Sequence, residues 1–206
     1  VAAMRDVHVL VDHEDRKACI ADQLEQVAAT KQLQPVIDDN LLDEVTGLVE
    51  WPNVIMGQIE TEFMSLPPEV LVTSMRVHQK FFALSQKGAT ENLAPFFMTV
   101  TNRRSDLVND KLIAAGNERV LRARLADAKF FYEQDKQTPL DSLAEKLEVI
   151  TFYEGLGSVA DKAERMAALA GAIANHLDAA DPDTARRAAV LAKVDLASEM
   201  VGEFPE

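Results

Sequence analysis

Eight basic side chains gather between residues 101 and 136, and they are the clearest candidates for chemistry in this 206-residue chain. Six acidic side chains lie among them, so this stretch carries +2, the remaining residues carry −15, and the whole chain carries −13. Arginine presents forked donors that fit phosphate oxygens, so the ligand that this chemistry suits is an RNA backbone. The residues that we single out for phosphate contact are Arg103, Arg104, Arg119, Arg122, Arg124 and Lys129.

The same basic residues have an ordinary alternative, which is ion pairing within an acidic protein. Arg124 and Asp127 are three positions apart, a spacing at which helix side chains meet. Exposed ion pairs of this kind are common and weak. The low isoelectric point of about 4.7 is also not typical of a free-standing nucleic-acid binder. The residues alone therefore favour internal pairing.

Other catalytic and metal-binding patterns are absent from the sequence. Gly155 and Gly157 lack the third glycine and the preceding strand of a phosphate-binding loop, so we predict a turn there. Cys19 is the single cysteine, which excludes a cysteine-rich zinc site within this chain. We assign no catalytic residue and no metal ligand. No two histidines have the spacing of a helical ligand pair; they are His8, His13, His78 and His176.

The elements that would precede the basic stretch predict a small sheet with helices packed on it. Strands are expected at 7–11, 55–63, 81–84 and 95–100, the last two forming a hairpin with a long connection. Helices are expected at 12–31, after the N-cap acids at 38–39, and after the two prolines at 67–68.

After residue 102 the pattern becomes helical, and we predict no further strand. A helix from Asn117 places one basic ridge beside one apolar stripe. Two long helices follow at 158–177 and 183–204, joined by a loop at 178–183. The fold class is therefore α+β, with a mixed domain at 1–102 and a helical domain at 103–206. The apolar stripe consists of Leu121, Leu125, Ala128 and Phe131, and the ridge of Arg119, Arg122, Ala126 and Lys129.

Targeting signals are absent from the sequence, and its two ends suggest a piece of a longer protein. No run approaches the roughly 20 apolar residues of a membrane span, and no secretory leader is present. The chain begins Val1-Ala2-Ala3 without an initiator methionine and stops directly after a helical pattern. We expect an internal fragment of a cytoplasmic protein that does not bind membranes.

A run that begins at Gly116 carries the most specific pattern of the chain. It reads Gly116-Asn117-Glu118-Arg119-Val120-Leu121-Arg122-Ala123-Arg124-Leu125-Ala126-Asp127-Ala128-Lys129-Phe130-Phe131. It resembles the G-N-E-x-V-x-x-x-R-L-x-D-A-x-F-F signature of bacterial glycyl-tRNA synthetase beta chains. Further matches occur in family order: Leu48-Val49-Glu50-Trp51-Pro52, Gln79-Lys80-Phe81-Phe82, Val100-Thr101-Asn102, Asp135, Leu140, Gly155-Leu156-Gly157-Ser158, Asp161-Lys162, Arg165, Lys193-Val194-Asp195-Leu196 and Met200-Val201-Gly202-Glu203-Phe204.

The resemblance implies a part in the attachment of glycine to tRNA. In that family the enzyme is a heterotetramer of two alpha and two beta chains. The alpha chain binds ATP with Mg²⁺ and carries out both chemical steps, and the beta chain binds tRNA. The implied partners are thus an alpha chain, glycine tRNA and a second beta chain, and the fragment alone is expected to be inactive. The implied folds are a B3/B4-like domain followed by an HD-like helical domain.

Two departures from the family pattern leave alternatives open. No His-Asp dipeptide occurs, although HD phosphohydrolases require one for their metal set. The helical half is therefore expected to be non-catalytic. The chain also stops where the family continues with a Gln-Gly-rich stretch, so the helical domain is expected to be truncated at its C-terminus and the anticodon-recognising region to be missing. One alternative is a purely structural docking module that does not bind RNA. Another is a metal-dependent HD-type phosphohydrolase fragment, for which Asp195 and His176 would be the obvious ligands.

Overall fold

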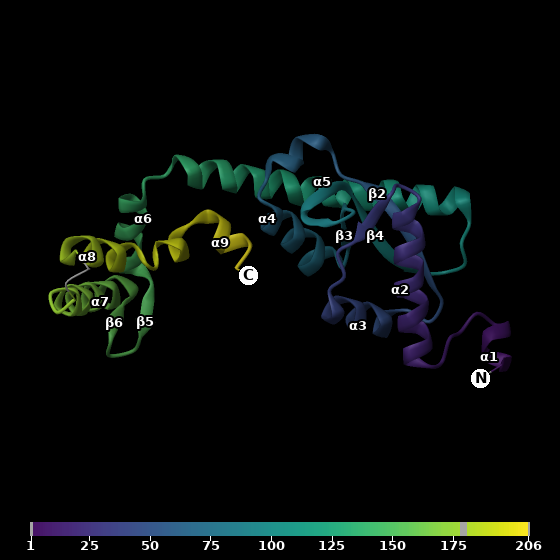
Figure 1. Ribbon diagram of the computed structural model, residues 1–206, viewed down its shortest axis with the longest axis horizontal. Coiled ribbons are helices and arrows are strands. Elements are labelled where there is room, and N and C mark those ends of the chain that lie inside the picture. The colour runs from purple at the N-terminus through teal and green to yellow at the C-terminus, as the bar shows by residue number, and fades with distance from the viewer. Residues whose placement is uncertain (1, 178–180, 206) are drawn as a thin grey trace. The chain divides into compact units, whose positions relative to one another are not determined.

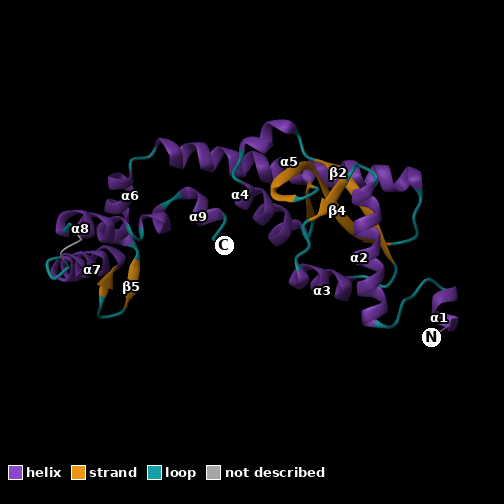
Figure 2. Cartoon of the chain, viewed as in Figure 1, coloured by secondary structure: helices purple, strands orange, loops and turns teal. Residues whose placement is uncertain are grey.

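The computed structural model describes residues 2–177 and 181–205, and it confirms the α+β class (Figures 1 and 2). The chain divides into two compact units, residues 1–129 and residues 130–206, and the boundary falls within one long helix. Contacts thus group residues 103–129 with the sheet, while the domain boundary after residue 102 and the two domain likenesses stay predictions. In the described part of the chain, no helix is both long and apolar enough to cross a membrane.

Unit 1 is built around a four-stranded antiparallel sheet in the order β1-β3-β4-β2. Strands β2 and β4 pair from Pro52 opposite Asn102 to Gln58 opposite Phe96. The strands are β1 Leu33–Pro35, β2 Pro52–Gln58, β3 Phe82–Gln86 and β4 Ala89–Asn102. The helices are α1 Ala2–Asp6, α2 His13–Ala29, α3 Asp39–Leu48, the 3₁₀ turn η1 Thr61–Ser65, α4 Pro68–Thr73, the π turn η2 Ser74–His78 and the first part of α5 Leu107–Gln137.

Local signals in the sequence set where these helices begin. The side chain of Asp12 accepts a hydrogen bond from the backbone N–H of Asp15 at 3.0 Å and caps α2. Asp38 does the same for α3 through the N–H of Leu41, also at 3.0 Å. Pro68 occupies the first turn of α4, where its missing N–H leaves no bond unmade.

One face of the sheet is covered by α2 and α3, and Figure 1 shows α2 lying along the sheet beside β2. Leu24 of α2 and Leu41 of α3 pack in one buried cluster with Met98 of β4. Successive strand residues point to opposite faces, so Phe97, which is equally buried, belongs to the other face. Its ring stacks on that of Phe81 with centroids 4.5 Å apart.

Gly57 on β2 lies directly opposite Phe97 in the register. A Cβ atom at Gly57 would lie 2.3 Å from the Phe97 ring, closer than two carbon atoms can approach. The aromatic side chain therefore fills the space that any other residue at position 57 would need.

Several expected details of unit 1 are wrong. The strand at 7–11 does not form; α1 is followed by turns, and His8 has a φ of 64°. The strand expected at 55–63 spans Pro52–Gln58 instead; the N–H of Ile59 still donates to the carbonyl oxygen of Pro95 at 2.9 Å, but Pro95 has no N–H to return a bond, and η1 follows from Thr61. The β3–β4 connection is a two-residue turn with Gly88 at a φ of 78°, and α5 begins at Leu107 rather than Asn117.

Unit 2 is mainly helical. Its small core contains Leu143, Leu147, Val159 and Val194. Gly171 lets α7 approach α8 closely, since a Cβ there would lie 2.4 Å from Nε of Arg186. The elements are the end of α5, α6 Leu140–Lys146, the 3₁₀ turn η3 Leu147–Val149, β5 Thr151–Tyr153, β6 Gly157–Ser158, α7 Val159–Ala174, α8 Pro182–Leu191, the 3₁₀ turn η4 Val194–Ala197 and α9 Glu199–Glu203.

Two expectations for this unit need correction. A short antiparallel hairpin, β5–β6, interrupts what was expected to be helix only. The helix expected at 183–204 is three segments, because Ser198 ends η4 and its side chain caps α9 through the N–H of Val201. Of the expected loop at 178–183, residues 178–180 lie outside the described part. The helix expected at 158–177 is confirmed as α7, which begins with a capping box between Ser158 and Asp161.

Candidate nucleic-acid interface

The six basic residues singled out from the sequence all lie in unit 1. Arg103 and Arg104 precede α5, and the other four lie on it. Arg104, Arg119 and Arg122 are exposed, whereas the remaining three are half-buried. The structure thus brings four of the six onto a single helix, as the periodicity predicted.

Two members of the predicted ridge pair with acids of the segment that follows β2. Nε of Arg122 lies 2.5 Å from a carboxylate oxygen of Glu60. Nζ of Lys129 lies 2.8 Å from a carboxylate oxygen of Glu62 and 5.8 Å from the centre of the Phe63 ring. Both ion pairs are largely exposed, a setting in which such pairs contribute roughly 0–1 kcal/mol. They align α5 with the end of the sheet but leave both cations within reach of solvent.

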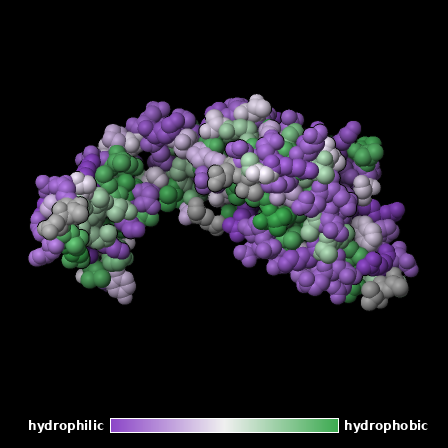
Figure 3. Space-filling model, viewed as in Figure 1, coloured by the Kyte–Doolittle hydropathy of each residue, from purple (hydrophilic) through white to green (hydrophobic). Residues whose placement is uncertain are grey.

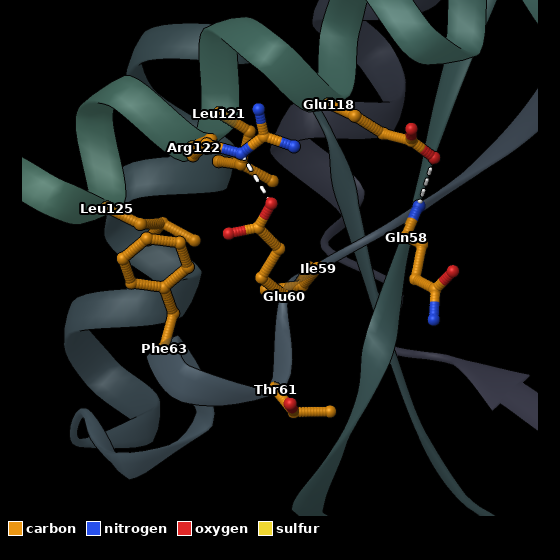
Figure 4. A pocket seen from close by; sticks show the side chains of 9 residues that line it. All are labelled: Gln58, Ile59, Glu60, Thr61, Phe63, Glu118, Leu121, Arg122 and Leu125. Carbon is orange, nitrogen blue, oxygen red and sulfur yellow. Dashed lines mark hydrogen bonds and ion pairs between the residues drawn. The ribbon is translucent and has the colours of Figure 1, made fainter.

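A third contact fixes the position of α5 along β2. A carboxylate oxygen of Glu118 accepts a hydrogen bond from the backbone N–H of Gln58 at 2.8 Å. This N–H belongs to the last residue of β2, so Glu118 satisfies a donor at the end of the strand. Figure 4 shows this bond beside the Arg122–Glu60 pair, with both acids and the arginine facing the same hollow.

The hollow between α5 and the β2–η1 segment has a volume of about 370 Å³. Leu121 and Leu125 on α5 and Phe63 on η1 form its apolar wall, and Leu125 lies beside Phe63 in Figure 4. Glu60 and Arg122 form its polar rim and satisfy each other. This arrangement explains why one helix face carries both buried leucines and charged side chains: it forms a packing seam with a polar edge.

The acidic partners of this seam were not among the residues singled out from the sequence. Their signal was nevertheless present, since Gln58, Glu60 and Glu62 alternate along the polar face of the strand predicted at 55–63. An acidic strand face and a basic helix ridge in one chain are complementary. What the sequence lacked was a reason to place the two next to each other across about 60 residues.

The segment between β4 and α5 holds the other two arginines. Arg103 lies 3.9 Å from Asp106, and its Nε donates to the carbonyl oxygen of Arg104 at 3.3 Å. The side chain of Asn109 and then the backbone N–H of Val108 donate to Asp106, and these bonds hold the pKa of that carboxyl below its ordinary value. The anion therefore stays charged beside Arg103, and it caps the start of α5.

Arg104 and Arg119 differ from Arg122 and Lys129 in their surroundings. Both are exposed, and neither makes a side-chain hydrogen bond or ion pair with another residue in the described part of the chain. An exposed guanidinium without a carboxylate partner keeps all five N–H donors for a phosphate. Chemically, these two residues are the most available of the six to an anionic ligand.

The other predicted features have structural roles. Gly155 lies in the turn of the β5–β6 hairpin with a φ of 80°, which confirms a turn, and Gly157 begins β6 with a φ of 86°. The His8 ring packs against Trp51 with centroids 4.9 Å apart. Among the described residues, no group of three or more His, Cys, Asp or Glu side chains could hold a metal ion.

Comparison with known proteins identifies relatives over the whole chain. A family model described as "Glycyl-tRNA synthetase beta subunit" matches residues 1–206. The chain is similar to the glycine–tRNA ligase beta subunits of Bacillus subtilis (45% identical over 98% of the chain), Azotobacter vinelandii (46% over 98%) and Coxiella burnetii (47% over 96%). It spans only 30%, 29% and 28% of the length of these relatives.

Proposed function

The chain belongs to the glycyl-tRNA synthetase beta subunit family, and from this premise we propose that it contributes tRNA binding and subunit assembly to a glycine–tRNA ligase. In this proposal an alpha chain activates glycine with ATP and Mg²⁺ in the cytoplasm, and the present residues carry out no chemical step. Because the chain spans about a third of its relatives, the activity of the whole enzyme is part of the proposal.

The observation that carries the RNA part of the proposal is the exposed basic surface on and before α5 in an otherwise acidic chain. Arg104 and Arg119 are its most available members. Arg122 and Lys129 can exchange their exposed carboxylate partners for phosphate at little cost, since such pairs are weak. Arg103 beside Asp106 and the half-buried Arg124 complete the set.

The test replaces two arginines on one helix face. In the assembly with the alpha chain, we expect Arg119→Gln/Arg122→Gln to weaken binding of glycine tRNA. The slope of log affinity against log salt should also become shallower by about 2, because each lost phosphate contact removes about 1. Fluorescence anisotropy of labelled tRNA at several salt concentrations measures both quantities.

The matched control is Glu60→Gln, which breaks the same ion pair but keeps the charge of Arg122. If Arg122 contacts phosphate, this variant should bind tRNA as tightly as the parent or more tightly, because a competing anion is gone. If the two variants weaken binding equally, Arg122 acts only through its pair with Glu60. Unchanged affinity and slope in the double variant would refute the assignment of both arginines.

The assembly part of the proposal rests on a different observation. Leu107, Val108 and Leu112 in the first turns of α5 are 79%, 77% and 71% exposed, and Figure 3 shows hydrophobic atoms at the surface there. An exposed apolar patch on a protein surface commonly marks an interaction site. We propose that it contacts the alpha chain.

The change Leu107→Ser/Val108→Ser tests this contact. We expect it to reduce co-purification with the alpha chain while the folded beta chain keeps its tRNA affinity. Leu169→Ser, at a 62% exposed position on α7, is the control for a general loss of surface hydrophobicity. If Leu107→Ser/Val108→Ser retains as much alpha chain as the control Leu169→Ser does, the proposed contact is refuted.

A further inference from the structure

A second hollow in unit 1 lies at the Pro52 end of β2, whereas the first lies at the Gln58 end. Its volume is about 600 Å³, within the range of about 300–1,000 Å³ typical of small-ligand sites. One side is formed by α2, and the others by Arg5, Leu10, the start of β2 and Ser105. The lining residues that matter here are Cys19, Asp22, Gln26, Trp51, Asn53 and Ser105.

Trp51 provides an aromatic wall that is held from two directions. Its backbone N–H and that of Glu50 both donate to Oδ1 of Asn102, at 2.9 and 3.0 Å. The His8 ring packs against the indole with an interplanar angle of 70°. The ring is half-buried, its backbone is fixed by the two bonds to Asn102, and its own contact is with His8. A preorganised aromatic wall loses little freedom when a ligand stacks on it.

The α2 wall of the hollow is the polar face of an amphipathic helix. Ile20, Leu24 and Ala28 of α2 are buried in the core, so the hollow is lined by the opposite side. Asp22 and Gln26 lie one turn apart on that side, and both are exposed. Within the described part of the chain, neither side chain makes a hydrogen bond or an ion pair, so both are available to a ligand.

The adjacent Gln23 differs from them, because its amide is already used. Its Oε1 accepts from the backbone N–H of Val54 at 2.9 Å, and its Nε2 donates to the carbonyl oxygen of Pro52 at 3.0 Å. These bonds fasten α2 to the start of β2. They therefore keep the two walls of the hollow at a fixed separation.

The basic segment before α5 borders this hollow. Ser105 donates to Asp110 at 3.0 Å, and Asn53 donates to the same carboxylate at 3.2 Å. Asp110 therefore links the segment to Asn53, which also lines the hollow. Arg103 and Arg104 immediately precede Ser105. The chain segment that carries both arginines therefore passes the edge of the hollow, which is also lined by Arg5, an arginine paired with Asp15 at 2.9 Å.

We propose that this hollow holds one unstacked nucleotide of RNA, its base against Trp51 and its phosphate near Arg103 and Arg104. This inference rests on the proposed function, since it names where the bound tRNA places a base. The Asp22 carboxylate accepts hydrogen bonds only, and the Gln26 amide both donates and accepts. Guanine can donate its N1–H and its amino group to one carboxylate and accept at O6 from an amide N–H, so it suits this pair better than uracil, which has a single N–H donor.

Trp51 is the single tryptophan of the chain, so its fluorescence reports directly on the site. We expect a short guanine-containing single-stranded RNA, and GMP at higher concentration, to quench this emission, and UMP to quench it less. Trp51→Ala should weaken binding of end-labelled RNA roughly 5- to 100-fold, the range found when a base–aromatic stack is lost. Trp51→Phe should restore part of the affinity.

Asp22→Asn is the second variant, and it guards against a folding defect because Asp22 is exposed. It should keep the circular dichroism spectrum of the parent and reduce the preference for GMP over UMP. Glu25→Gln, at an exposed position on the same helix that does not line the hollow, should leave this preference unchanged.

The outcomes separate this inference from the function on which it rests. If the folded chain binds tRNA with unchanged Trp51 emission, and Trp51→Ala binds equally well, the nucleotide site is refuted and the proposed function stands. If the alpha chain binds tRNA as tightly alone as it does together with this chain, the proposed function fails as well. Quenching by free GMP but not by RNA would identify a soluble nucleotide as the ligand and overturn the RNA assignment. Quenching only by the alpha chain would assign the hollow to a protein partner.

Discussion

The two units of the chain reach stability in different ways. Unit 1 buries large side chains on both faces of a sheet, with Phe82, Phe97 and Met98 almost fully excluded from solvent. Unit 2 has a small core, a close helix approach at Gly171 and several polar contacts at helix ends. Unit 1 therefore depends on side chains that fill the volume of its core, whereas unit 2 depends more on helix caps and on the close approach of two helices.

The largest expected effect comes from emptying the unit 1 core. Phe97→Ala should lower the free energy of unfolding by about 3–5 kcal/mol, because the cavity cannot close around a sheet residue opposite Gly57. Urea unfolding followed by Trp51 fluorescence measures it. Leu48→Ala, at a 64% exposed position of the same unit, is the control and should change little. A loss below about 1 kcal/mol for Phe97→Ala would contradict the importance of volume in this unit.

A deletion in the unit 2 core sharpens the comparison. Leu147→Ala should destabilise this unit by about 2–5 kcal/mol, since the side chain is 1% exposed. Trp51 lies in unit 1, so its fluorescence transition should stay in place while part of the circular dichroism transition moves to lower urea. If both signals shift together by the same amount, the two units unfold as one.

The importance of caps in unit 2 is tested at Asp135. Its two carboxylate oxygens accept from the backbone N–H groups of Glu199 and Met200 at 3.0 and 2.9 Å, and so cap α9. Asp135→Ala should cost about 1 kcal/mol. Asp135→Asn keeps one acceptor and should cost less. Equal stability of all three proteins in urea would show that α9 does not need this cap.

The smallest effect concerns acid. Two nitrogens of Arg187 donate to Asp141 at 2.5 and 2.9 Å, which holds the pKa of Asp141 below its ordinary value of 3.8. A carboxyl with a lowered folded pKa stabilises the protein above pH 3.8, and this contribution disappears as the pH falls through the folded value.

Arg187→Gln should therefore raise the pKa of Asp141 towards 3.8 and make unit 2 slightly less sensitive to acid. NMR titration of the Asp141 side-chain carboxyl measures the shift. Arg186→Gln, which removes the neighbouring pair with Asp183, should leave the Asp141 titration unchanged. If Asp141 titrates identically in Arg187→Gln and the parent, solvent screens the pair completely.

Much of the fold was predictable because its signals are local. Asp38 as a cap, Pro68 in a first turn and the Ser158 cap are read from neighbouring residues. The errors concern long-range pairing. Nothing near Gln58 indicates that β2 stops there, since at the next residue, Ile59, the strand meets Pro95, which accepts a hydrogen bond but cannot donate one. The start of α5 was missed because residues 107–116 form a mostly exposed helix. This segment has no apolar stripe that packs on a core.

The candidate site shows the same division. The periodicity of α5 correctly placed Arg119, Arg122 and Lys129 along one helix. It did not reveal that Arg122 and Lys129 face Glu60 and Glu62 whereas Arg119 does not. The hollow beside Trp51 was also beyond prediction, since its walls come from α2, β2 and the segment at 103–106.

By itself the sequence determined the family, the α+β class, most helix starts and the location of the basic stretch, because each depends on residue order within a short window. Only the tertiary structure decided which cations are already paired, where the strands end and which residues enclose the two hollows of unit 1. These properties depend on groups about 30–60 residues apart in the sequence that come together only when the chain packs. Contacts over such separations produce no periodic pattern of residue types in the sequence.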